Sequence, residues 1–283
     1  MTKKGSKDVL QNITKSDKRR SKRIEKILII GADSQIGSAL IGHLDKQGNR
    51  VYGTSRRNKR KGLLYLDLSE KSFDIDFSFF DCVVICAGVT SVRKCEEEPE
   101  LCEIVNSINI KGIVEECVNS KSFVIFLSSN AVFDGQMSFY KHNSRANPIT
   151  QYGKFKLSVE EYIQRLPSNK ACILRLTKVI SPETTFMNNW KDEAEKGNVV
   201  EAFENRFISP ISIENVLQSI DLLIKRRVSG IFQLGDNREI SFFDYAKEIF
   251  STQPEISNKL VAVKAKDTVL ISKHNSLITH LPN

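Results

Sequence analysis

Short apolar runs alternate along the chain with longer segments in which apolar side chains recur at helical spacing. Strands that are apolar throughout and separated by helices are typical of a parallel sheet covered on both faces. Because crossovers between parallel strands are right-handed, this order predicts an α/β fold with a doubly wound parallel sheet. Helices are expected after the first run, over about 100–119 and over about 150–165, and strands at KILIIGA (26–32), RVYGTS (50–55), LLYLDL (63–68), DCVVICAG (81–88), KSFVIFLSS (121–129) and ACILRL (171–176).

Beyond residue 178 the alternation of apolar runs and helical segments becomes less regular. The pattern there predicts a polar helix over 184–196, an extended piece over 198–209, a helix over 213–226, GIFQLG (230–235) and another helix after Ile240. A chain of 283 residues is near the size at which one core begins to divide. We therefore divide the chain into a tail (1–25), a sheet domain (26–178) and a smaller C-terminal α/β lobe (179–283).

The net charge of +8 comes almost entirely from residues 1–26, which hold ten basic and three acidic side chains. This segment lacks the apolar region of a secretory signal, and its acids are unlike an organellar transit peptide. It is interpreted as a solvated, disordered extension, with an arm that contacts a membrane surface or an acidic partner as the alternative. Nucleic-acid binding is not expected. The longest apolar runs fall far short of the roughly 20 residues of a transmembrane helix.

The six cysteines and four histidines have no spacing typical of a metal site. Cys82 and Cys86 lie in an apolar run and do not form a CxxC pair. We expect six small buried thiols in a reducing cytoplasm, and no metal site.

The first apolar run ends in GADSQIG (31–37), where a helix is expected to begin. Gly31 is expected to make the turn and Gly37 to allow close helix–strand packing, with Ser34 at the middle position. A turn of this kind, at the first strand–helix junction of a parallel sheet, binds the pyrophosphate of a dinucleotide at the helix N-terminus. Residues 26–178 are therefore interpreted as an NAD(P)-binding Rossmann domain, and residues 179–283 as a substrate-binding lobe.

The end of the second strand favours NADPH over NADH. About 20 residues past the turn, an NAD site places an acid against the ribose 2′-hydroxyl. This chain has Ser55, Arg56, Arg57 and Lys59 there, with no acid nearby in the sequence. Guanidinium groups suit a 2′-phosphate in charge and geometry. The alternative is a solvated basic loop.

Tyr152 and Lys156 in TQYGKFK (150–156) are one helical turn apart and share a face. A neighbouring ammonium favours the phenolate, which would let a tyrosine exchange protons near neutral pH. The preceding strand ends in Ser128 and Ser129, whose hydroxyls could bond a substrate carbonyl, and Asn109 lies before that strand.

The order of these motifs resembles the extended short-chain dehydrogenase/reductase family: GADSQIG, ICAG, the N-x-x-G of 109–112, LSS and YxxxK. Within it, SSNAVFDG (128–135), Pro148 with YGKFK, SPISIENV (209–216) and GIFQLGDNREISFFDYAKEI resemble the dTDP-4-dehydrorhamnose reductase branch, over about residues 26–250. The resemblance implies an NADPH-dependent reductase of a 4-keto sugar nucleotide that serves cell-surface polysaccharide synthesis.

The resemblance also implies roles for matching positions. Tyr152 would protonate the carbonyl oxygen, Lys156 would lower the Tyr152 pKa and bind the nicotinamide ribose, and Ser129 would orient the carbonyl. Asn109 would have a supporting, structural role. The cofactor would lie along Gly31, Ser34, Gln35, Ile36 and Gly37 at the diphosphate, Arg56 and Arg57 at the 2′-phosphate, Asp67 and Leu68 at the adenine, and Ala87 and Gly88 beyond it.

The departures from the branch line the substrate side. Asn130-Ala131 stands where the branch has Asp-Tyr, Lys141 and His142 stand where it has an acid, and Lys178 stands where it has a tryptophan. Phe186 and Trp190 are candidates for stacking on a nucleobase, with packing as the alternative. Two other functions stay open: an NAD-dependent epimerase or dehydratase, and a non-catalytic nucleotide-binding subunit that regulates a partner enzyme. A homodimer is also left open.

Overall fold

A seven-stranded parallel sheet forms the centre of the computed structural model, which describes residues 25–57, 62–167, 169–182, 184–266 and 271–282. Its strand order is β11-β6-β5-β4-β1-β2-β3, and every neighbouring pair is parallel. The predicted α/β fold with a doubly wound Rossmann sheet is confirmed. The strands are β1 (Lys26–Ile30), β2 (Arg50–Ser55), β3 (Leu64–Tyr65), β4 (Cys82–Ile85), β5 (Phe123–Ser129), β6 (Ala171–Leu176) and β11 (Gly230–Leu234).

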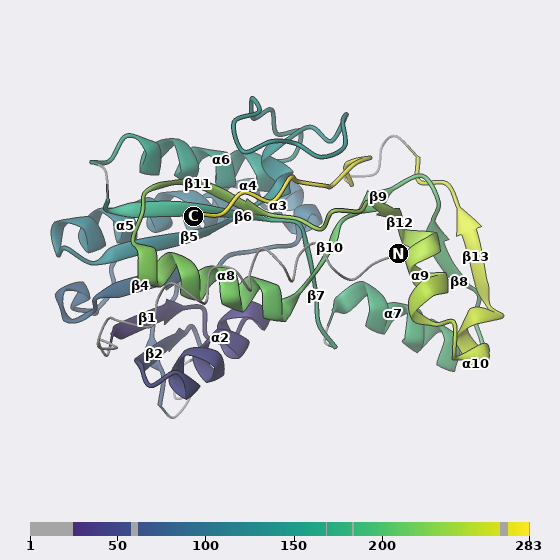
Figure 1. Ribbon diagram of the computed structural model, residues 1–283, viewed down its shortest axis with the longest axis horizontal. Coiled ribbons are helices and arrows are strands. Elements are labelled where there is room, and N and C mark those ends of the chain that lie inside the picture. The colour runs from purple at the N-terminus through teal and green to yellow at the C-terminus, as the bar shows by residue number, and fades with distance from the viewer. Residues whose placement is uncertain (1–24, 58–61, 168, 183, 267–270, 283) are drawn as a thin grey trace.

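Helices cover both faces of this sheet (Figure 1). Alternate residues of each strand point to opposite faces, so Ile27 and Ile29 of β1 join one apolar cluster and Leu28 and Ile30 the other. The first cluster is closed by α2 (Gln35–Lys46) and α8 (Ile213–Arg226), and the second by α5 (Asn109–Asn119) and α6 (Gln151–Gln164). Between β4 and α5 lie α3 (Val92–Glu97), α4 (Pro99–Glu103) and a π-helical turn (Ile104–Ile108).

Several of these helices begin where the sequence supplies a capping hydroxyl. Ser34, Thr150, Ser212 and Ser241 each accept a hydrogen bond from the N–H group three residues later. Such a bond satisfies one of the N–H groups that the first helical turn leaves unpaired. Short 3₁₀ turns follow the same logic at Phe77–Phe79, capped by Asp76, and at Asn130–Val132, capped by Ser129.

A smaller lobe has its own apolar cluster, built around Trp190, Tyr245 and Phe250 (Figure 1, right). The boundary expected at residue 178 does not separate the sheet domain from the smaller lobe cleanly. Two later elements belong to the sheet domain, because α8 packs under the main sheet and β11 pairs with β6 inside it. The lobe is therefore built from two separate stretches of the chain. Its helices are α7 (Thr185–Glu195), α9 (Phe242–Ile249) and α10 (Pro254–Ser257). Its strands form three pairs: β7 (Lys178–Ile180) with β10 (Pro210–Ser212), β9 (Phe207–Ile208) with β12 (Ile240–Ser241), and β8 (Val200–Phe203) with β13 (Leu260–Val263).

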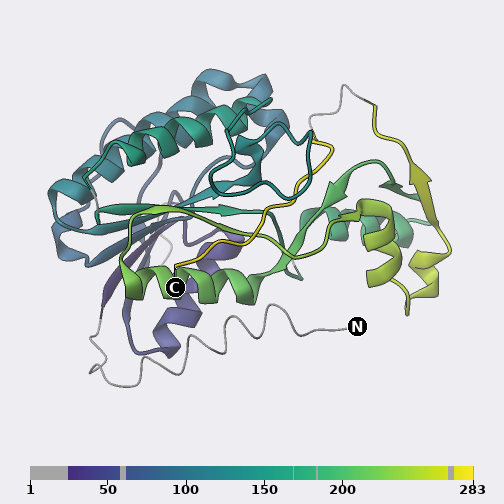
Figure 2. The same ribbon diagram turned by 45° about the horizontal axis from the view of Figure 1, so that its top comes forward.

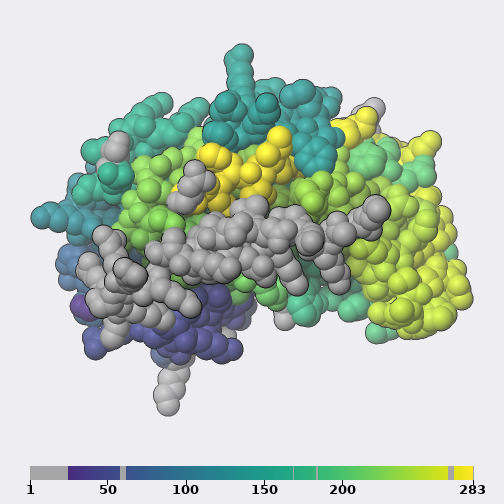
Figure 3. Space-filling model, viewed as in Figure 1, coloured from purple at the N-terminus to yellow at the C-terminus, as the bar shows by residue number. Residues whose placement is uncertain are grey.

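The C-terminal segment 271–282 returns from the smaller lobe to the main sheet (Figure 2). It forms isolated bridges from Leu277 to Tyr140 and from His280 to Gln233. In the space-filling view it lies between the loop that follows β5 and the region of β11 and α8 (Figure 3). It thereby joins both lobes to the loop that follows β5.

Among the described residues, no helix has the length and apolarity to span a membrane. All six cysteines are unpaired, and every one except Cys86 is fully buried. The basic tail expected over 1–25 lies almost wholly outside the described residues.

Candidate active site

Two glycines and a serine shape the turn that follows β1. Gly31 has a φ of +89°, and a Cβ on it would lie 2.8 Å from backbone atoms of Ala87. A Cβ on Gly37 would lie 2.2 Å from the carbonyl oxygen of Gly31. Ser34 caps α2 by accepting the Gly37 N–H at 3.0 Å. Because side chains are excluded here, the backbone at the start of α2 can approach an anionic group closely.

The next two residues of the turn, Gln35 and Ile36, contact other parts of the protein. The Gln35 amide nitrogen donates to the Ser181 hydroxyl at 2.6 Å, which joins the turn to the end of β7. Ile36 is partly buried against the cluster under the sheet. These contacts fix the turn against the connection to the smaller lobe.

The end of β2 holds an acid that the linear sequence does not suggest. The Ser55 hydroxyl donates to the carboxylate of Asp33, which belongs to the turn after β1. The same hydroxyl accepts the Arg57 N–H at 3.0 Å, and Arg56 and Arg57 are exposed. No acid lies near Ser55 in the linear sequence, yet the fold brings Asp33 there. Lys59 lies outside the described residues.

The remaining residues expected along the cofactor lie after β3 and β4. Leu68 is buried, and the Asp67 carboxylate accepts from the N–H and the hydroxyl of Ser69. Ala87 is the residue that approaches Gly31, and Gly88 has a φ of +151°. Ala87 therefore borders the turn after β1, Gly88 lies beside Asn106, and the Asp67 carboxylate is bonded within a local turn.

Two asparagines around the π-helical turn fix these loops. Asn109 donates to the carbonyl oxygens of Leu68 and Glu70, each at 2.8 Å, so it supports a loop and does not join Ser129. Buried Asn106 accepts from the Val89 N–H at 2.7 Å and donates to the Val89 carbonyl at 2.9 Å. Asn106 was not predicted as a site residue, because a π-helical turn shifts side chains out of the ordinary helical period.

The fold brings Ser129, Tyr152 and Lys156 together. Ser129 ends β5, and Tyr152 lies in the first turn of α6 and is hydrogen-bonded to it. Lys156, one turn later, donates to the Leu127 carbonyl at 2.9 Å. The approach depends on Gly153, where a Cβ would lie 2.1 Å from the Ala131 carbonyl oxygen. Only a glycine lets the helix come this close to the end of β5.

Burial has the largest effect on the pKa values of both Tyr152 and Lys156. Burial raises the pKa of Tyr152 to about 12, against the lowering effect of the Ser129 hydrogen bond. Burial lowers the pKa of Lys156 to about 8, which still leaves it mostly protonated at pH 7. Lys156 was expected to lower the pKa of Tyr152; in the structure, burial of the phenol dominates that pKa. A neutral phenol is the form that can donate a proton.

A buried ion pair lies beneath the site. Arg175 of β6 and Glu160 of α6 are 2% and 0% exposed, with 2.6 Å between Nη2 and Oε2. The Ser128 hydroxyl donates to the Glu160 carboxylate at 2.5 Å, so this hydroxyl is engaged by the ion pair. Arg175 also donates to the His142 carbonyl at 3.1 Å. This network joins α6, β5, β6 and the loop after β5, and no sequence motif indicates it.

The loop and strand residues that depart from the branch lie around this edge of the sheet. The His142 ring stacks on His280, with 3.7 Å between ring centroids. Lys178 begins β7, and its Nζ lies 5.1 Å from the centroid of the Phe186 ring in α7. Burial lowers the pKa of Lys178.

Trp190 has a packing role. It is 8% exposed, its indole N–H donates to the Glu201 carbonyl at 3.1 Å, and its ring contacts Phe186 edge to face. Phe186 and Trp190 also line a hollow of about 380 Å³ between α7 and β8. Within the part of the chain that the structure describes, no group of three or more His, Cys, Asp or Glu side chains could hold a metal ion.

Comparisons with known proteins agree with this architecture. The family model described as "RmlD substrate binding domain" matches residues 25–274. The chain is 26% identical over 234 residues to a probable low-salt glycan biosynthesis reductase, Agl14, of Haloferax volcanii. The aligned region covers 78% of each protein. It is 25% identical over 244 residues to the dTDP-4-dehydrorhamnose reductase of Salmonella typhimurium, covering 79% of this chain and 77% of that protein.

Two further comparisons add a subunit of another enzyme and a solved structure. The chain is 25% identical over 234 residues to methionine adenosyltransferase 2 subunit beta of Xenopus tropicalis, covering 77% of this chain and 69% of that protein. Its fold matches the crystal structure of a dTDP-4-dehydrorhamnose reductase from Clostridium acetobutylicum with a TM-score of 0.79, over 90% of each chain at 23% identity. The relatives therefore include enzymes and a subunit of another enzyme.

Proposed function

The chain belongs to the RmlD substrate binding domain family of the extended short-chain dehydrogenase/reductases, which are NAD(P)-dependent oxidoreductases, and we propose that it reduces the 4-keto group of a sugar nucleotide with NADPH. The observation that carries the proposal is the grouping of Ser129, Tyr152 and Lys156 at the carboxyl edge of the sheet. The match to two named reductases supports the same reaction class.

The residues after β1 fit a dinucleotide. The space that Cβ atoms on Gly31 and Gly37 would fill is taken up by backbone, and the N-terminus of α2 follows directly. Gly31, Ser34 and Gly37 would hold the diphosphate, and Arg56 and Arg57 would hold a 2′-phosphate. When bound, the nicotinamide supplies the hydride.

The chain's own residues would handle the proton and the orientation of the carbonyl. Tyr152, kept neutral by burial, would donate its proton to the carbonyl oxygen. Ser129 would hydrogen-bond the same oxygen, and the Lys156 ammonium would stabilise the phenolate that remains. Positioning by β5 and α6 supplies the orientation that such a transfer needs.

Cofactor binding tests the proposal first. Purified protein is titrated with NADPH and with NADH and followed by fluorescence, with Arg56→Ala as the matched variant. Tight NADPH binding that weakens in Arg56→Ala supports the proposal, and 4-keto sugar nucleotides are then screened for NADPH oxidation. Tyr152→Phe should abolish turnover while NADPH affinity stays nearly intact. Full activity in that variant contradicts Tyr152 as the proton donor.

The similarity to methionine adenosyltransferase 2 subunit beta favours a second candidate, a nucleotide-binding subunit that regulates a partner enzyme. This candidate predicts cofactor binding without NADPH oxidation on any sugar nucleotide. An epimerase or dehydratase would instead copurify with NAD and consume no NADPH.

We also infer a cytoplasmic location, which six unpaired cysteines support because disulfides are rare in a reducing compartment. Cell fractionation with an antibody against the chain tests it. Recovery outside the cytoplasm contradicts the inference.

A further inference from the structure

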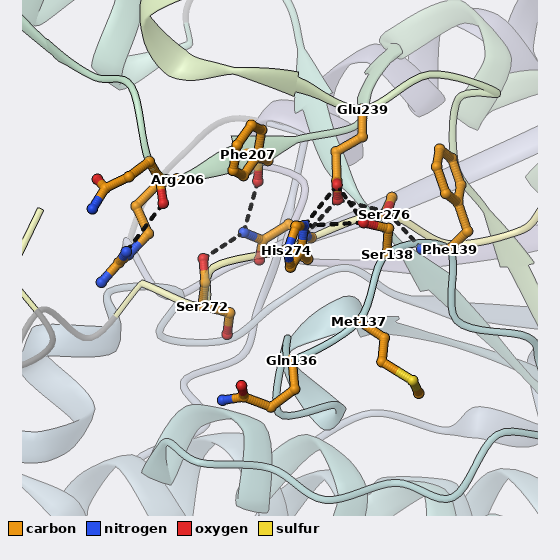
Figure 4. Close-up of polar contacts among 12 residues, drawn as sticks. Gln136, Met137, Ser138, Phe139, Arg206, Phe207, Glu239, Ser272, His274 and Ser276 are labelled. Carbon is orange, nitrogen blue, oxygen red and sulfur yellow. Dashed lines mark hydrogen bonds and ion pairs between the residues drawn. The ribbon is translucent and has the colours of Figure 1, made fainter. Parts of the chain in front are cut away.

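The start of the C-terminal segment is fastened by Glu239, which directly precedes β12 (Figure 4). Its carboxylate accepts from the Ser276 hydroxyl at 2.6 Å and from the Ser138 hydroxyl at 2.7 Å, and it lies 2.7 Å from Nδ1 of His274. Burial raises the pKa of Glu239, but the hydrogen bonds that the carboxylate accepts outweigh burial and bring that pKa below its ordinary value. Because the carboxylate stays charged in mild acid, a proton gained by His274 would strengthen this contact.

The far end of the same segment is fixed to the main sheet. The backbones of His280 and of Gln233 in β11 exchange hydrogen bonds of 2.8 and 2.9 Å. The side-chain nitrogen of Gln233, which is fully buried, donates to the Ile278 carbonyl at 2.6 Å and to the Tyr140 carbonyl at 2.7 Å. The position of the His280 backbone is therefore set by β11.

The His280 ring lies face to face with the ring of His142, which belongs to the loop after β5. The ring centroids are 3.7 Å apart and the planes differ by 10°, and the Phe232 ring of β11 lies 5.9 Å from His280. Both histidines are half-buried. Two neutral imidazole rings can pack at this distance, whereas two imidazolium ions repel each other, and partial burial strengthens the repulsion. Burial lowers the pKa of His280, and the charge of His142 lowers it further.

The charged groups that the structure places around this pair are cations or are already paired. Arg175 of β6 donates to the His142 carbonyl at 3.1 Å, and its charge is paired with Glu160 of α6 at 2.6 Å. Lys141 and Arg145, on the same loop as His142, are exposed cations. The two β11 side chains described above are uncharged. A second positive charge on the pair is therefore not offset by these groups.

His142 belongs to residues 141–147, here called the outer loop. The loop rejoins the protein where the Asn147 N–H donates to the Val132 carbonyl at 2.9 Å. Before that point, the His142 ring joins the loop to the C-terminal segment. Residues 144–147 line one side of a hollow of about 570 Å³. Separation of the two rings would free the loop to move and would widen this hollow.

We propose that the His142–His280 stack is a pH-operated fastening, which opens when both rings are protonated and so releases the outer loop from a C-terminal segment that Glu239 and β11 keep in place. The device needs neither cofactor nor substrate, so it stands apart from the proposed reductase activity. The direction with pH follows from His280, which binds its proton less readily in the closed state than in the open state. The stack therefore stabilises the closed loop fully above about pH 6.5, the ordinary pKa of histidine, and loses this effect as the pH falls.

The test measures the distance between the outer loop and the C-terminal segment. Spin labels are attached to cysteines introduced at two exposed positions, Asn143→Cys and Lys273→Cys, and pulsed electron paramagnetic resonance gives their separation at pH 7.5 and at pH 5. Circular dichroism checks that the full chain is folded at both pH values, and protein without these substitutions checks that the native cysteines stay unlabelled. The population with the longer separation should rise about tenfold at pH 5, the change that one pKa unit of coupling produces.

His142→Phe keeps an aromatic ring in the stack but cannot carry a charge, so its label separation should stay short at both pH values. His43→Phe is the matched control, because the His43 ring bonds Gln47 at the end of α2, and it should open in acid as the wild type does. An acid response in His142→Phe equal to that of the wild type, or no response in the wild type, overturns the proposal. His280→Phe decides in the same way if His142→Phe does not fold.

Discussion

Arg175 holds Glu160 side-on, through two N–H groups on one edge of its guanidinium group, with Nε 3.0 Å from Oε1 and Nη2 2.6 Å from Oε2. The pair is buried under the helix that carries Tyr152, and Arg175 also reaches the loop after β5 through the His142 carbonyl. The ion pair is therefore a rigid link between the Tyr152 helix and the substrate side.

Removing one partner should be costly. Arg175→Leu leaves the Glu160 carboxylate buried and unpaired, and we expect a loss of about 3–5 kcal/mol in the free energy of unfolding. Urea denaturation measures it. Arg175→Leu combined with Glu160→Leu leaves no buried charge and should recover most of the loss. Equal destabilisation in the single and double variants contradicts the role of the unpaired charge.

Gly153 sets how closely α6 approaches β5. Gly153→Ala would place a methyl group 2.1 Å from the Ala131 carbonyl oxygen, so the helix must move and carry Tyr152 away from Ser129. We expect turnover to fall by about 100-fold, since a displacement near 1 Å has that effect on positioned groups. Steady-state kinetics measure it.

The control for this variant is Gly112→Ala in α5, where a Cβ meets no atom within 4 Å. That substitution should stabilise the protein by about 0.5–1 kcal/mol and leave turnover unchanged, because alanine is the better helix former. Unchanged turnover in Gly153→Ala would show that the helix position is not critical.

The sequence predicts the main elements well, because their signals are local. The apolar run at 171–176 and the amphipathic pattern over 213–226 coincide with β6 and α8. The positions of β11 in the main sheet and of α8 against its face were missed, because the pairing of β6 with β11 joins residues about 60 positions apart. No local pattern records that contact.

The parts of the site that escaped prediction depend on the same kind of distant contact. Asp33 meets Ser55, Glu160 meets Arg175, and Asn130 meets Asn275 only after folding. Each residue looks ordinary in its own segment. A motif read along the chain finds Tyr152 and Lys156 because their spacing is one helical turn, and it cannot find a partner supplied by another element.

Lys156 should cost stability at neutral pH. Its pKa is about 8 in the folded protein, below the ordinary 10.5, so the unfolded chain binds more protons between these values and stability rises with pH there. The penalty is fully present below pH 8. Lys156→Met removes it and should be more stable than the wild type by about 2 kcal/mol at pH 7, after the loss of the Leu127 hydrogen bond.

Urea denaturation at pH 7 and near pH 10 measures this difference, which should shrink at the higher pH. Turnover should be lost in the same variant, because Lys156 is needed beside Tyr152. A gap between variant and wild type that stays constant with pH contradicts a buried, titrating lysine at this position.

Asp33 should limit the preference for NADPH. Its carboxylate, bonded by the Ser55 hydroxyl at the end of β2, lies where the adenosine ribose is expected, and a negative charge there repels a 2′-phosphate. Asp33→Asn keeps an oxygen for Ser55 and removes the charge. We expect the ratio of NADPH to NADH affinity to rise about tenfold, equivalent to about 1.4 kcal/mol.

Fluorescence titration with both cofactors measures the ratio, and Arg56→Ala is the opposite control because it removes a positive charge from the same strand end. The ratio should fall in Arg56→Ala, and NADH affinity should change less than NADPH affinity in both variants. Parallel changes for the two cofactors would mean that neither side chain senses the 2′-position. A fall in the ratio in Asp33→Asn would mean that the carboxylate acts by orienting Ser55 toward the phosphate, and not by its charge.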